Sequence, residues 1–366
     1  MLLVTFHGGA KPGINNVYCY DTTNNTLLTD NALRNIDAGK LSELRALVYA
    51  NGCLYVANGA KSISNILTFQ HLSSEKPDHF SYVIDFVDSS SGKNGFPTAI
   101  AHPYSLAFDN AGFAYISNQD TNVVAQVTVS GNFQTGTLKS GVQSSYLIAQ
   151  EKNLCPSGKC VFLDGTFVAS QRGNLDGVAV SATDVPSNLG GLAVSPATGK
   201  VQNSVRDVVV ANGMLFVCDE PNQVIRIYAL PNGNYLGASA ELADKPTHLA
   251  VQNGGLYVSA GSNLYWSQLP ISSPNVALNF QSILTAPSGN KIGGISFNQS
   301  NAAAVVYVCF QLGTGGAVGG SIEAYSVAQA ASGSAPSFSS GQVVASSPKD
   351  FQDTPEFVLY LADSLT

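Results

Sequence analysis

The sequence predicts an all-β fold assembled from a repeated antiparallel unit. Residues 45–58, 206–219 and 247–260 share one pattern, in which an apolar strand, an Asn-Gly pair and a second apolar strand follow one another. A two-residue type I′ turn needs positive φ at both central positions, which Asn-Gly supplies, so each stretch is predicted to be a hairpin. A third strand and a more polar fourth strand usually follow. Four antiparallel strands in each unit are typical of a β-propeller blade.

The two ends of the chain are predicted to share one blade. Residues 2–6 and 16–21 have the pattern of second and third strands, and residues 355–361 that of a lone first strand, so pairing of the ends would close a ring. First strands begin near residues 44, 104, 206, 247, 293 and 356, and residues 141–204 are long enough for a further blade. We therefore expect a single domain, residues 1–366, with seven four-stranded antiparallel blades. The alternative is six blades with an insertion.

The composition limits the classes of function. Of 366 residues, 17 are Lys or Arg and 24 are Asp or Glu, which gives a net charge of −7, and 45% are hydrophobic. The sequence has no basic run, which argues against nucleic acid or an anionic membrane as a partner. No apolar stretch approaches the roughly 18 residues of a membrane-spanning helix. We expect a folded monomer whose partner is a small anion or a peptide.

The cysteines and the first residues bear on the cellular location. Residues 1–6 lack the basic segment and long apolar core of a secretory signal. Either the protein is cytoplasmic, or Met1 precedes a mature secreted chain; the Lys-poor composition, rich in Asn, Ser and Thr, favours an extracellular or periplasmic location. Pro and Gly turn the chain between Cys155 and Cys160, so these two cysteines could form a disulfide, but the sequence does not decide whether they do. The other cysteines, predicted to be small buried hydrophobes, are Cys19, Cys53, Cys218 and Cys309.

Two stretches resemble a known group of repeats. Residues 102–118 read His-Pro-Tyr-Ser-Leu-Ala-Phe-Asp-Asn-Ala-Gly-Phe-Ala-Tyr-Ile-Ser-Asn, and residues 219–228 read Asp-Glu-Pro-Asn-Gln-Val-Ile-Arg-Ile-Tyr. They resemble the repeats of NHL and YVTN (YncE-like) β-propellers, and the resemblance covers nearly the whole chain. It implies a fold and no single activity, because that group includes scaffolds, ligand binders, lactonases and lyases. No catalytic motif carries over.

One rim of the predicted ring collects charged and polar side chains. The loops that lead into first strands share this rim with the loops that join second and third strands. When the hairpins are aligned by their turns, the residues at this rim are Arg45, His102, Tyr104, Arg206, Lys245, Lys291 and Glu356. Arg presents a planar fork of donors suited to carboxylate or phosphate, and Lys adds a point charge. We predict a site for a small anionic or polar ligand, or a peptide carboxylate, at the mouth of the central channel. The alternative is local pairing of solvated charges.

Two further functions stay open. His248 beside Asp207 would act as a general base, with the carboxylate fixing the imidazole tautomer, in a lactonase-like hydrolase or lyase. In the same class, His7, His102 and His248 would hold a metal, but they come from distant blades and share no close sequence spacing, so no metal site is assigned. The second alternative is a protein-interaction scaffold. The sequence leaves open whether the protein is an enzyme, and the cofactor is unknown.

Overall fold

The regular secondary structure of the described residues is almost entirely β-strand, which confirms the all-β prediction. A computed structural model describes residues 1–7, 13–60, 63–88, 102–119, 123–128, 143–146, 160–161, 167–168, 205–220, 223–230, 234–269, 278–298, 304–313, 318–328 and 333–362. Within these ranges the only helix is the short 3₁₀ helix η1 (Ala38–Lys40). No helix in the described ranges is long and apolar enough to cross a membrane.

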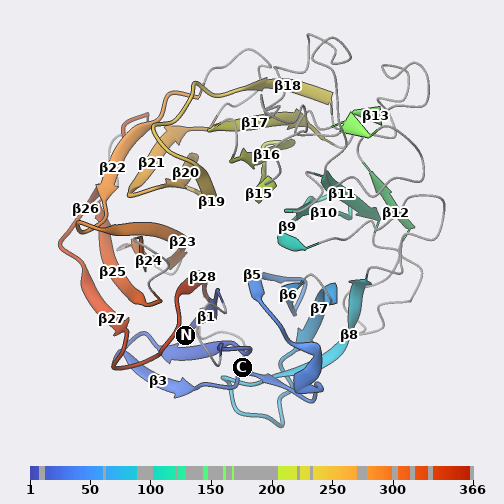
Figure 1. The fold of residues 1–366 in the computed structure, drawn as a ribbon, viewed down its shortest axis with the longest axis vertical. Coiled ribbons are helices and arrows are strands. Elements are labelled where there is room, and N and C mark those ends of the chain that lie inside the picture. The colour runs from blue at the N-terminus through green and yellow to red at the C-terminus, as the bar shows by residue number, and fades with distance from the viewer. Residues whose placement is uncertain are drawn as a thin grey trace.

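Sheets of four or five strands stand around a common axis, as the blades of a propeller do (Figure 1). Five of them are each built from one continuous stretch of chain. They contain β4 (Leu33–Arg34), β5 (Leu44–Ala50), β6 (Cys53–Ala60), β7 (Ile63–Gln70) and β8 (Phe80–Asp88); β9 (Pro103–Phe108), β10 (Phe113–Asn118), β11 (Val123–Thr128) and β12 (Gln143–Tyr146); β15 (Val205–Ala211), β16 (Met214–Asp219), β17 (Val224–Ala229) and β18 (Asn234–Ala238); β19 (Pro246–Gln252), β20 (Gly255–Ala260), β21 (Asn263–Gln268) and β22 (Gln281–Thr285); and β23 (Asn290–Asn298), β24 (Ala304–Leu312), β25 (Gly320–Ala328), β26 (Ser337–Phe338) and β27 (Gln342–Ser346). Each blade is named below after its innermost strand: β5, β9, β15, β19 or β23.

The remaining sheet, the closing blade, is shared by the chain ends as predicted. It contains β28 (Pro355–Tyr360), β1 (Leu2–Phe6), β2 (Tyr18–Asp21) and β3 (Thr26–Thr29), in that order from the axis outward. β28 and β1 pair antiparallel, with Leu3 opposite Leu359. The amino group of Met1 also donates a hydrogen bond of 2.9 Å to the carbonyl of Leu361. Backbone hydrogen bonds between the two ends therefore close the ring.

The prediction of seven four-stranded blades is wrong. β9 packs directly against β15, so no blade stands between them, although residues 141–204 separate them in the sequence. In that segment the structure describes β12, which completes the β9 blade, and a two-stranded ribbon of β13 (Cys160–Val161) and β14 (Phe167–Val168). The alternative, six four-stranded blades with an insertion, is not borne out as stated either: two sheets have five strands, and the insertion lies largely outside the described residues. Segment length was the wrong criterion, because a blade needs an innermost strand packed between two neighbours.

The three Asn-Gly pairs form the predicted hairpin turns. Both residues have positive φ in each pair, for example 50° at Asn212 and 70° at Gly213. Each turn joins the innermost strand of a blade to the next strand, as in the pairing of β15 with β16. The turns therefore lie on the rim opposite to the one at which the innermost strands begin.

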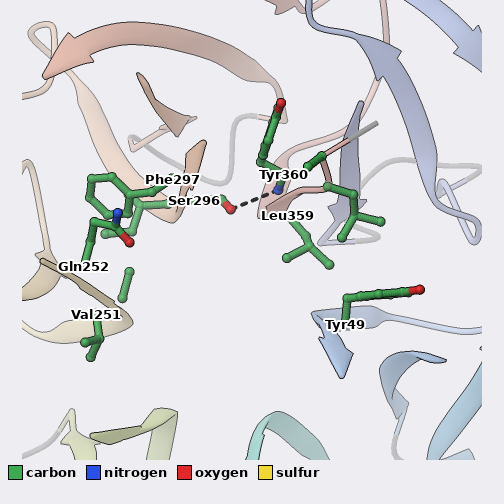
Figure 2. Close-up of a pocket in the computed structure, with 11 residues that line it drawn as sticks. Tyr49, Val251, Gln252, Ser296, Phe297, Leu359 and Tyr360 are labelled. Atoms are coloured by element: carbon green, nitrogen blue, oxygen red, sulfur yellow. Dashed lines mark hydrogen bonds between the residues drawn. The ribbon is translucent and has the colours of Figure 1, made fainter. Parts of the chain in front are cut away.

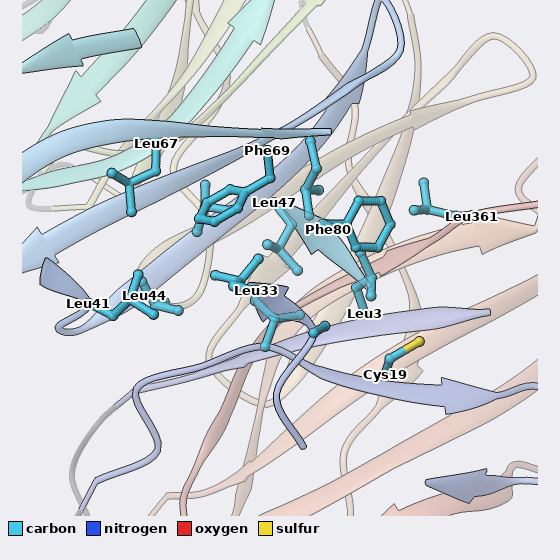
Figure 3. Close-up of a cluster of buried hydrophobic side chains, with 14 of the residues drawn as sticks. Leu3, Cys19, Leu33, Leu41, Leu44, Leu47, Leu67, Phe69, Phe80 and Leu361 are labelled. Carbon is cyan, nitrogen blue, oxygen red and sulfur yellow. The ribbon is translucent and has the colours of Figure 1, made fainter. Parts of the chain in front are cut away.

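The core consists of apolar layers between neighbouring blades. Figure 3 shows the layer between the closing blade and the β5 blade, where Leu3 and Phe69 belong to one cluster. Tyr55 and Phe108 meet between the β5 and β9 blades, with ring centroids 4.8 Å apart. Comparable clusters lie between the β9 and β15, β15 and β19, β19 and β23, and β23 and closing blades. Each blade therefore buries apolar side chains on both of its faces, and the hydrophobic residues are distributed around the whole ring.

The four cysteines predicted to be small buried hydrophobes are buried and free, which confirms that interpretation; they are Cys19, Cys53, Cys218 and Cys309. Burial raises the pKa of Cys19 to about 12, so its thiol stays protonated at neutral pH. The side chains of Cys155 and Cys160 are outside the part of the chain that the structure describes, so the possible disulfide between them stays a prediction.

We expect Gly213→Ala to lower the free energy of unfolding by about 1–2 kcal/mol, because an L residue with a Cβ is strained at positive φ. A Cβ at this position would meet nothing within 4 Å, so the cost is conformational and not steric. Gly213→Asn is the matched control and should cost less, because Asn adopts the left-handed region more readily. Chemical denaturation of the two variants measures the difference, and equal losses would contradict the assignment of the turn.

Candidate functional site at the mouth of the ring

The rim at which the innermost strands begin, here called the mouth, gathers most of the side chains singled out in the sequence. The opposite rim, which carries the Asn-Gly turns, is called the turn side. At the mouth, four of these side chains occupy the second position of an innermost strand: Arg45 of β5, Tyr104 of β9, Arg206 of β15 and Glu356 of β28. Because the innermost strands surround one axis, these positions converge although they are up to 311 residues apart in the sequence (Figure 1).

A buried ion pair lies at the centre of the mouth. Arg45 Nη1 donates to Glu356 Oε2 at 2.9 Å, and the two residues are only 3% and 4% exposed. His7, directly after β1, places Nδ1 2.5 Å from the same carboxylate oxygen. Burial alone would raise the pKa of Glu356, but Arg45 and His7 outweigh it and hold this pKa well below its usual range. The Glu356 carboxylate is therefore ionised at neutral pH.

A chain of hydrogen bonds leads from this carboxylate to the β19 blade. Tyr104 Oη donates to Glu356 Oε1 at 3.0 Å and lies 3.2 Å from His248 Nε2. Since the single hydroxyl proton of Tyr104 is given to Glu356, His248 Nε2 is the donor to Tyr104, and its Nδ1 is hydrogen-bonded to Thr247 Oγ1 at 3.0 Å. Burial lowers the pKa of His248 to about 4, so the imidazole is neutral at pH 7.

Arg206 forms the partly exposed side of the mouth. Its guanidinium carbon lies 4.9 Å from the centroid of the Tyr104 ring. Nε donates to Glu220 Oε2 and Nη1 to Gln119 Oε1, both at 2.8 Å. Lys245 Nζ lies 3.6 Å from the other oxygen of Glu220, so two cations share one carboxylate.

Asp207 does not pair with His248, contrary to the arrangement proposed for a general base. Its two carboxylate oxygens accept the backbone N–H groups of Val208 and Leu249, each at 2.8 Å. The bond to Leu249 ties β15 to β19. Burial raises the pKa of Asp207 to about 6. The hydrogen bonds from Ser105 and the two backbone amides lower this pKa, but burial outweighs them.

The remaining predicted residues lie outside the central network. His102 is buried beside Glu43, with Nε2 3.5 Å from its carboxylate, and Glu43 also lies 3.5 Å from Arg45 Nη2. Lys291, at the start of β23, is exposed, and no contact joins it to the network among the described residues. The described residues also contain no group of three or more His, Cys, Asp or Glu side chains that could hold a metal ion.

The sequence analysis missed Gln119 and Glu220, which hold the Arg206 guanidinium. A signal for them exists, because each of three hairpins ends in a polar residue, at Asn58, Asn118 and Asp219. The next residue in two of these repeats is Gln119 or Glu220, in the loop that leads back from the second strand at the mouth. Aligning second strands as well as first strands would have found both.

The ring of radial sheets and its converging innermost strands define a β-propeller. No protein-family model matches the chain, and no curated protein matches it in sequence. A protein of known structure from Lactobacillus plantarum has a TM-score of 0.56 at 12% identity, with 99% of each chain covered. A putative 6-phosphogluconolactonase from Bacteroides uniformis has a TM-score of 0.48 at 12% identity, over 96% of this chain and 83% of that one. The β-propeller domain of a protein from Myceliophteria thermophila has a TM-score of 0.43 at 9% identity, over 86% and 90%. At 12% identity, the likeness to the Lactobacillus plantarum protein supports the fold alone.

We expect Glu356→Gln to lower the free energy of unfolding by about 3–5 kcal/mol, because the buried Arg45 guanidinium would lose its buried counter-ion and keep only the exposed Glu43 at 3.5 Å. Removing the cation as well, in Arg45→Met with Glu356→Gln, should restore part of this loss. Denaturation of both single variants and the double variant measures the coupling. Lys349→Gln, at an exposed pair with Asp350, should change stability by less than about 1 kcal/mol. Additive losses in the double variant would contradict a coupled pair.

The neutral imidazole of His248 predicts loss of stability in acid. Its pKa falls to about 4 in the folded protein from 6.5 in the unfolded chain, so the unfolded chain binds more protons between these values. The free energy of unfolding of the wild type minus that of His248→Phe should therefore fall by up to about 3 kcal/mol between pH 6.5 and 4. The wild-type profile alone is flatter than this difference, because Asp207, whose pKa rises to about 6, contributes with the opposite sign over the same range in both proteins. Parallel profiles for the wild type and His248→Phe would contradict the assignment.

Proposed function

We propose that the protein is a binding propeller that recognises a small anionic ligand, or a peptide carboxylate, at its mouth. The observation that carries the proposal is the pair of cations that share one carboxylate. Arg206 and Lys245 both face Glu220, so this side of the mouth holds more local positive than negative charge. An anion from solvent would complete the pairing with charge-assisted hydrogen bonds.

The geometry of Arg206 favours binding of a flat oxyanion. Nε and Nη1 are fixed by Glu220 and Gln119, and the guanidinium is stacked over Tyr104, which leaves Nη2 without a hydrogen bond among the described residues. A guanidinium held in this way loses little entropy when a ligand binds. Lys245, with a side chain 57% exposed, is free to move toward the ligand.

Arg45 has a supporting part in this proposal. Since it is 3% exposed and bonded to Glu356, it positions Tyr104 and the channel wall and does not meet the ligand directly. The lactonase-like alternative has less support, because His248 is 2% exposed and both of its ring nitrogens are engaged. The resemblance to NHL and YncE-like repeats is compatible with ligand binding, since that group includes binders.

Calorimetric titration tests the proposal with acetate, succinate, citrate, inorganic phosphate, and a short peptide with a free or an amidated carboxyl terminus. At least one anion should bind, and the amidated peptide should bind less well than the free one if the ligand is a peptide carboxylate. Arg206→Gln should weaken binding by about 10-fold to 100-fold, the loss expected for charge-assisted hydrogen bonds. Lys245→Gln, at an exposed position, should weaken it by a smaller factor.

The matched control is Lys349→Gln, which removes the same charge from a side chain that is 84% exposed and distant in sequence from the mouth. It should leave binding unchanged. Equal effects of Arg206→Gln and Lys349→Gln, or no response of the wild-type protein to any of the anions, would refute the proposal and favour the scaffold interpretation.

A further inference from the structure

The central channel differs between its two halves. In β5, Leu44–Leu47 are buried, whereas the following three residues are half-exposed. β9 and β28 change from buried to half-exposed in the same direction, and so do β15 and β19 except for one half-exposed residue near the start of each. The innermost strands are therefore packed together at the mouth and stand apart toward the turn side. The channel opens on the rim opposite to the charged network.

Two cavities occupy the open half. One, of about 290 Å³, lies between the innermost strands and is lined by residues of all of them, including Asp207 and Ser105. The other, of about 370 Å³, lies at the turn side between β19, β23 and β28, with Tyr49 of β5 at its edge (Figure 2). Four residues line both cavities: Val251, Ile295, Ser296 and Leu359. The two cavities therefore adjoin each other, and their volumes lie at or near the lower end of the size range of small-molecule sites.

A single charged side chain lines this space. The side chains around it are otherwise Ala, Val, Leu, Ile, Phe, Tyr, Ser and Gln, and Asp207 stands at the inner end, next to the packed half of the channel. Asp207 is 5% exposed and belongs to no ion pair within the described part of the chain. The backbone amides of Val208 and Leu249 and the side chain of Ser105 take three of the roughly four acceptor positions of this carboxylate, so one position remains for a further hydrogen bond.

We propose that the channel binds a primary amine with an apolar tail, which enters from the turn side and places its ammonium group against Asp207. The tail would lie along Val251, Ile295 and Leu359 and lose contact with water. A buried carboxylate without a cation is a costly arrangement, and an ammonium group would supply the missing charge. An anion would be repelled there, so this site is distinct in place and in ligand from the proposed anion site at the mouth.

The pH dependence isolates Asp207 from the groups around it. The titratable groups near it are Arg206 on its own strand, Cys218 on β16, Tyr104 on β9, His248 on β19 and Glu356 on β28. The pKa of Asp207 is about 6, while that of His248 is about 4, those of Cys218 and Tyr104 lie above their usual values, and that of Glu356 lies below. Between pH 5 and 7, Asp207 is thus the group among them that changes charge.

Titration calorimetry of the full chain with n-octylamine and with 1-octanol tests the proposal. The wild-type protein should bind one equivalent of octylamine at least tenfold more tightly than octanol at pH 7. Octylamine affinity should rise about tenfold from pH 5 to pH 7 as Asp207 ionises, and octanol affinity should not change. Equal affinity for the two probes, no binding of either, or an octylamine affinity independent of pH would overturn the proposal.

Two variants locate the site. Asp207→Asn should weaken octylamine binding at least tenfold and leave octanol binding unchanged. If this variant fails to fold, Val251→Phe, which fills the space common to both cavities, should abolish binding of both probes. Val343→Phe on β27, at a side chain 54% exposed outside the channel lining, is its control and should bind as the wild type does. Unchanged octylamine binding in Val251→Phe would overturn the proposal, and Arg206→Gln should leave octylamine binding intact while it weakens anion binding.

Discussion

The ion pair between Arg45 and Glu356 is the constraint on which the mouth of the propeller depends. It joins β5 to β28, next to the strand pairing that closes the ring, and Tyr104 extends it to β9 through the other carboxylate oxygen. Burial of both charges costs several kcal/mol for each ion before pairing, so the geometry must satisfy them well. The Glu356 carboxylate accepts from Arg45 and Tyr104 and lies against His7. Because the cost of burial offsets much of the attraction, the main effect of the pair is to fix the positions of the β5, β9 and closing blades relative to one another.

This packing at the mouth also determines the shape of the channel. Large side chains at the starts of the innermost strands meet across the axis; for example, His248 and Phe357 have ring centroids 4.5 Å apart. Toward the turn side, the lining consists mainly of Val, Ala, Leu and Ile with a few aromatic side chains, and cavities remain between the strands. The closed half is thus polar and charged, and the open half is mainly apolar. One fold presents two chemically different surfaces at the two ends of its axis.

Much of this arrangement follows from local sequence. Asn-Gly turns fix the hairpins that start near Arg45 and Arg206, and aligning the other first strands to these hairpins is how Tyr104 and Glu356 are found from the sequence. Two features could not be found in that way. The number of blades depends on whether β9 and β15 touch, which is a long-range contact. The partner of Asp207 is a backbone amide on the next blade, which leaves no pattern in the sequence.

Asp207 and His248 illustrate how burial acts in opposite directions on neighbouring groups. Both are nearly inaccessible, and burial disfavours the charged form of each, so the pKa of the acid rises to about 6 and that of the base falls to about 4. His248 avoids a buried charge because the neutral imidazole can donate its hydrogen bond to Tyr104. Asp207 has no such neutral role at pH 7, because two strand-edge amides need two acceptor oxygens, and an Asn amide would supply one. The link between β15 and β19 therefore keeps a carboxylate at the inner end of an apolar channel, and the fold itself creates the negative charge that a cationic ligand would neutralise.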